Sequence, residues 1–159
     1  ELVRPRFAVS IAAPGMIIPL RVSVQAQMPL LAADSEESGI LVGADRITAA
    51  VAGTSTAEVA SNMRTDNPRL SGAVTTSIHT ADLAVAPVLG IELARAVKVG
   101  EIAGVAANSL WSDLAVLYEP TEPPFLVGPA TLLGYWGGTV ATTGFAQVIW
   151  AELPFSAIS

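Results

Sequence analysis

The chain has 159 residues, of which 52% are hydrophobic and only 14% are charged, whereas about 25% are charged in an average globular domain. The formal net charge of −6 argues against a nucleic-acid surface, which needs clustered Lys and Arg. The absence of cysteine excludes disulfides, thiolate catalysis and cysteine-ligated metals. Every apolar run is shorter than the roughly 18 residues of a membrane span. We therefore expect one domain over residues 1–159, with no membrane span and no nucleic-acid partner.

Alternating apolar and polar residues predict strands in the first third of the chain. Residues 6–11 alternate, and residues 20–28 do so most cleanly, with Arg, Ser and Gln between the apolar positions. Pro19 and Pro29 are expected to bracket that second strand. The acidic run 34–39 predicts an exposed loop. Its carboxylates lack the spacing of a calcium loop, so we predict no metal there.

Two middle segments, 49–67 and 88–108, allow more than one interpretation. Residues 55–58 have the spacing of a capping box and apolar residues follow at helical intervals, which predicts one short helix. A long irregular loop is the alternative. For residues 88–98, the flanking proline and glycines favour a strand, although the central residues have good helix propensity. A strongly helical middle would make the fold α+β.

The rest of the chain adds further strands. They are predicted at residues 40–44, 73–78, 113–118, 125–127, 130–136 and 145–153. Counting all segments gives about eight strands with no alternation of strand and helix. The fold class predicted is therefore all-β, a single jelly-roll β-sandwich of about eight antiparallel strands.

The last predicted strand, 145–153, is apolar on both faces. Phe145 shares one face with Gln147, Val148 and Trp150 share the other, and Glu152 is the single charge. An exposed antiparallel strand usually keeps one wet face. We therefore expect this strand to be covered by its own core and by a second copy, with Phe145, Val148 and Trp150 at the subunit interface.

Residue types that carry chemistry are sparse. His79 is the single histidine, and a zinc site needs about three or four ligands. A Ser–His–Asp arrangement built on His79 and Asp82 lacks a nucleophile elbow, and the glycine-rich segment 134–138 lacks the phosphate-loop pattern. We predict no catalytic residue, no metal and no cofactor, so the chain is not expected to be an enzyme.

Aromatic residues offer a second type of site. Trp111 and Trp136 lie next to predicted loops, where aromatic rings can stack on sugars. Packing in cores and subunit interfaces is the commoner use of such side chains. Trp111 and Trp136 are therefore candidate ligand contacts only in the alternative in which the chain binds a glycan or a host receptor.

The closing strands carry a resemblance. A strand at 114–118, a proline-bearing connection, a strand at 131–136, a Gly/Thr loop and the strand at 145–153 ending in Trp150–Ala151–Glu152 resemble the last strands of small trimeric jelly rolls. These belong to the tumour-necrosis-factor and complement globular-head type, with similar domains in bacteriophage structural proteins. The resemblance implies a homotrimer whose closing strands pack near the threefold axis. Without cysteine or a glycosylation sequon, the chain is more similar to a phage or bacterial relative.

These observations predict a non-enzymatic virion structural protein, made in the host cytoplasm and contacting capsid or other virion proteins. It would be a trimeric phage module that decorates or cements a capsid or forms a spike or fibre head. One alternative is a carbohydrate- or receptor-binding module. Another is a capsid shell protein with a single jelly roll.

Overall fold

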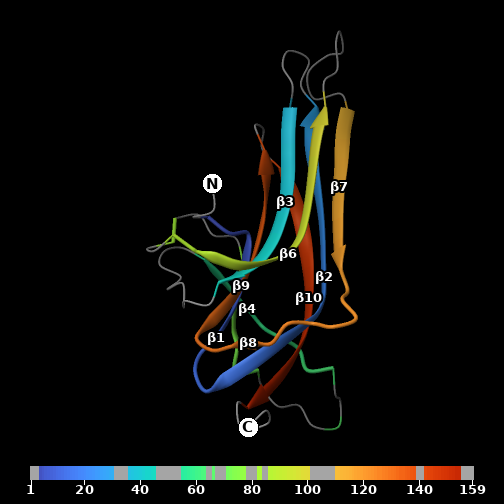
Figure 1. The fold of residues 1–159 in the computed structure, drawn as a ribbon. Helices are drawn as coiled ribbons and strands as arrows, with labels where there is room; N and C mark the ends of the chain where they lie inside the picture. Colours follow the sequence, from blue (N-terminus) through green and yellow to red (C-terminus); the bar gives the residue numbers. More distant parts are fainter. Residues whose placement is uncertain are drawn as a thin grey trace.

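The computed structural model describes residues 4–30, 36–45, 55–63, 66, 71–77, 82–83, 86–100, 110–138 and 142–154, without the side chains of 28–30, 36–37, 99–100, 110–112 and 138. These residues form ten strands and no helix (Figure 1). The strands are β1 (Phe7–Ile11), β2 (Gly15–Leu30), β3 (Glu36–Asp45), β4 (Thr56–Glu58), β5 (Val74–Ser77), β6 (Leu89–Gly100), β7 (Leu110–Tyr118), β8 (Leu126–Val127), β9 (Ala130–Gly138) and β10 (Thr143–Pro154). The all-β prediction is confirmed.

The strands form two antiparallel sheets that pack as a sandwich. The larger sheet has the order β4-β5-β1-β9-β3-β6 and the smaller one the order β10-β2-β7, with β8 paired to the start of β2. The antiparallel pairs are nested along the chain. The pair β4–β5 lies between β3 and β6, the pair β3–β6 lies between β2 and β7, and the pair β2–β7 lies between β1 and β9. This nesting is the rolled ribbon expected of a jelly roll. The last strand, β10, lies outside the ribbon and joins the free side of β2.

The core lies between the two sheets and follows from the period of two. It is formed by apolar side chains from the inward faces of both sheets, with Val22, Val24 and Ala26 from β2, Ile40, Val42 and Ala44 from β3, and Phe7, Val9 and Leu132 from β1 and β9. A second, smaller cluster lies on the outer face of the larger sheet, around Ala8, Leu133 and Tyr135. The middle of the larger sheet, around β1 and β9, is therefore buried on both faces.

β2 is longer than predicted, because it runs through both prolines that were expected to bracket it. Ile149 pairs with Arg21 while Trp150 pairs with Pro19, so Leu20 is an extra residue in the ladder. This bulge changes the parity of the inward positions, from Ile17 and Pro19 before it to Val22 and Val24 after it. Leu20, predicted to share the core face, is therefore exposed.

Several other predictions are corrected or left outside the described residues. Residues 56–58, predicted as either the start of a short helix or part of a long irregular loop, form β4, because their backbone pairs with β5. Residues 36–39 of the predicted acidic loop begin β3, because they pair with β6. The strand prediction for 88–98 is confirmed by β6. His79 and residues 46–54, 67–70 and 101–109 lie outside the described part of the chain.

Candidate assembly interface

Three of the four sheet edges are protected. β4 is only three residues long, and β6 carries Glu92, Arg95 and Lys98 together with two irregularities in its ladder. β7 lies beside β6, where the Lys98 Nζ donates a hydrogen bond to the backbone oxygen of Asp113 at 3.4 Å. Short length, charge, bulges and cover are the ways in which proteins block edge-to-edge pairing.

The irregularity in β6 places two of its charges on one side of the strand. Val42 pairs with Ala94 and Gly43 with Glu92, so Leu93 is an extra residue. Glu92 and Arg95 therefore face the same way, and their ion pair closes at 2.7 Å. The hydrogen bond from Arg95 lowers the pKa of the Glu92 carboxyl and, in return, raises the pKa of the Arg95 guanidinium. The edge of β6 thus presents an ion pair to solvent.

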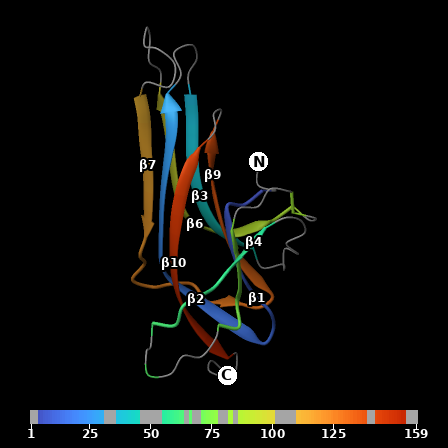
Figure 2. The same ribbon diagram turned by 180° about the vertical axis from the view of Figure 1, so that it is seen from behind.

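The fourth edge, β10, is unprotected. It is 12 residues long and, of the described strands, it pairs only with β2, on the opposite side of β2 from β7 (Figure 2). From Thr143 to Ala151 it contains no charged residue and no proline, and Glu152 is its single charge. A long, uncharged edge strand is a template for pairing with another chain. Among the described strands, β10 is therefore the best candidate for an assembly surface.

The three residues predicted for the subunit interface point to two different sides of β10. Val148 and Trp150 face inward and pack, half-buried, against the core of their own domain. Phe145 faces outward and is 61% exposed. An interface role for any of them stays a prediction. Trp150→Asp would place a charge against the domain's own core, so Phe145 is the better probe of assembly.

The outer face of the smaller sheet has a polar centre and apolar flanks. The central strand β2 presents Ser23 and Gln25, which lie between the neighbouring strands β10 and β7. Phe145 of β10 lies opposite Gln25, and Leu117 of β7, 55% exposed, lies opposite Ser23. Phe145 and Leu117 are thus comparably exposed side chains on one face, but only Phe145 belongs to the unprotected edge.

The far end of β10 is tied to the larger sheet by Glu152. Its carboxylate accepts hydrogen bonds of 2.7 Å from the Ser71 hydroxyl and from the backbone N–H of Gly72. The Ser71 hydroxyl also accepts a hydrogen bond from the backbone N–H of Ala73 at 3.0 Å. A Cβ added at Gly72 would lie 2.7 Å from the carboxylate, so glycine permits this close approach. The charged group of β10 therefore holds the chain that leads into β5.

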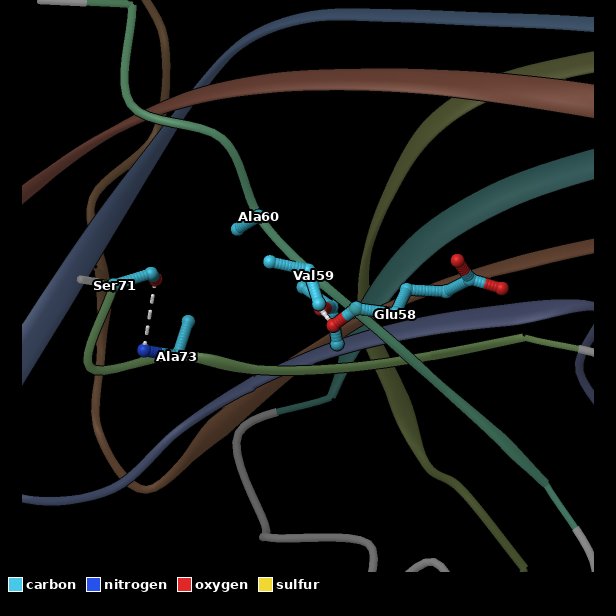
Figure 3. A pocket seen from close by; sticks show the side chains of 6 residues that line it. Glu58, Val59, Ala60, Ser71 and Ala73 are labelled. Atoms are coloured by element: carbon cyan, nitrogen blue, oxygen red, sulfur yellow. Dashed lines mark hydrogen bonds between the residues drawn. The ribbon is translucent and has the colours of Figure 1, made fainter. Parts of the chain in front are cut away.

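An open hollow of about 210 Å³ lies next to this contact (Figure 3). It forms where the chain leaving β4 and the chain entering β5 separate, and it is lined by Glu58, Val59, Ala60, Ser71, Ala73 and Thr75. The Thr75 hydroxyl donates to the backbone oxygen of Glu58 at 2.5 Å. The Glu58 carboxylate accepts from the Ser77 hydroxyl and points away from the other lining residues (Figure 3). The polar side chains of the wall thus already have hydrogen-bond partners, some in the wall and some outside it.

The two candidate ligand contacts differ in how they are placed. Trp136 is half-buried and packs against Phe7, with ring centroids 6.4 Å apart and planes tilted by 41°. Its indole nitrogen would lie 2.9 Å from a Cβ added at Gly144. The backbone of Trp111 pairs with Pro29, and its side chain lies outside the description. Their role as ligand contacts stays a prediction.

Tyr135 is a buried titratable residue on the outer face of the larger sheet. Its hydroxyl has no hydrogen-bond partner among the described residues. Burial, and then the nearby Asp45 carboxylate, raise the pKa of the phenol far above its usual value. Asp45 itself accepts a hydrogen bond from the backbone N–H of Val88 at 3.0 Å. The phenol therefore stays protonated at neutral pH.

The remaining findings bear on ligands and relatives. The described residues contain no group of three or more His, Cys, Asp or Glu side chains placed to hold a metal ion, and no helix long and apolar enough to cross a membrane. Comparisons with protein-family models, curated proteins and solved structures found no match to the chain.

Proposed function

We propose that this chain is a non-enzymatic structural module of a virion, which assembles as a homotrimer through β10 and decorates or cements a capsid or forms a spike or fibre head. The observation that carries the proposal is the unprotected edge of β10. Nine consecutive uncharged residues, Thr143 to Ala151, run along an edge whose outer side pairs with none of the described strands. The other described edges are short, charged or covered.

Composition supports burial of part of the surface. With 14% charged residues, the chain has few groups with which to keep a large surface solvated. Phe145 adds an exposed aromatic ring beside the open edge, and aromatic residues are enriched in protein interfaces. The proposed trimeric state and the virion context come from the resemblance of the closing strands to trimeric phage jelly rolls.

The trimer is tested by the mass of the purified protein in solution at micromolar concentration. Three copies of a 16.3-kDa chain give about 49 kDa. Phe145→Glu is expected to give single chains with an unchanged circular-dichroism spectrum, because the charge enters the interface and not the core. Leu117→Glu is the matched control, with similar exposure on the same face, and should remain a trimer. A wild-type protein that runs as a single chain contradicts the proposal.

The virion context needs a separate test. Particles from the source of this sequence are examined by electron microscopy with and without the gene. A structural role predicts density on the capsid or at a spike that disappears on deletion. Particles that are unchanged in shape, protein content and stability would contradict it.

A further inference from the structure

We draw no further inference here: the strongest candidate, the uncharged apolar patch where Phe125, Val127 and Leu153 are exposed on the outer face of the smaller sheet, carries none, because nothing in the structure shows what covers it.

Discussion

Gly134→Ala is expected to destabilise the fold strongly, because Gly134 has no room for a side chain. Gly134 of β9 pairs with Phe7 of β1. A Cβ added at Gly134 would lie 1.8 Å from one ring carbon of Phe7 and within 2.5 Å of two more. Cβ atoms essentially never approach other atoms closer than 3.0 Å. The ring of Phe7 must therefore move by more than 1 Å.

The Phe7 ring cannot move freely, because it is buried in the core and packs against Trp136. Forcing extra atoms into a well-packed core costs about 1–3 kcal/mol, and the depth of this clash places the cost in the upper half of that range. At roughly 2–4 °C per kcal/mol for a domain of this size, the melting temperature should fall by about 4–12 °C. Thermal and urea unfolding measure both quantities.

Gly137→Ala on the same strand is the matched control, since nothing lies within 4 Å of a Cβ added there. Its effect should stay within about 0.5 kcal/mol. Phe7→Leu in the Gly134→Ala background should recover part of the loss, giving a clear interaction energy in the double-mutant cycle. Equal stabilities of the Gly134→Ala and Gly137→Ala proteins would refute the packing of Phe7 over Gly134.

Two other predictions test the contacts around the sheets. Glu152→Gln weakens the charged hydrogen bonds to Ser71 and Gly72, so the Gly72 amide should exchange with deuterium faster, while Glu122→Gln leaves its exchange unchanged; equal exchange rates would refute the contact. Burial raises the pKa of both tyrosines, Tyr118 and Tyr135, so the folded protein holds the phenol protons more tightly than the unfolded chain does. Stability is therefore full below the unfolded pKa of about 10 and should fall as the pH rises above it. Ultraviolet titration should show Tyr135 ionising last or only on unfolding; a normal titration of both tyrosines contradicts its burial.

The sequence predicts much of the fold, because most strands have one face toward the core and one toward solvent. Apolar and polar residues therefore alternate along them. In β2 the alternating polar residues Arg21, Ser23 and Gln25 predict one solvent-facing side of the strand, and the structure places them outward. The two faces of β10 were also separated correctly. Which face points inward depends on its pairing with β2, and that pairing is decided by residues more than 100 positions away in the chain.

The failures have local causes. The capping-box pattern at residues 55–58 is a helix signal only where no partner strand competes, and pairing with β5 overrides it. The bulge at Leu20 follows from how β2 pairs with β10. It could not be inferred from the sequence, because adjacent apolar residues such as Ile17 and Ile18 do not show which positions face inward.

The candidate site was only partly accessible to sequence reasoning. Phe145 was predicted for the interface from the apolar faces of its strand, and the structure places it outward on β10, while its interface role stays a prediction. The Glu152 contact was missed because it joins segments about 80 residues apart. The hollow was missed because it forms only where the chain leaving β4 and the chain entering β5 separate. The one available signal was Glu152 itself, a single charge within an otherwise uncharged strand.

The mass of the wild-type chain and of its Phe145→Glu variant, measured side by side in solution, tests the central claim most directly. Assembly through β10 predicts about 49 kDa for the wild type, three copies of 16.3 kDa, and single chains for the variant. A wild-type mass of 16.3 kDa, or a variant that assembles as well as the wild type, would contradict it.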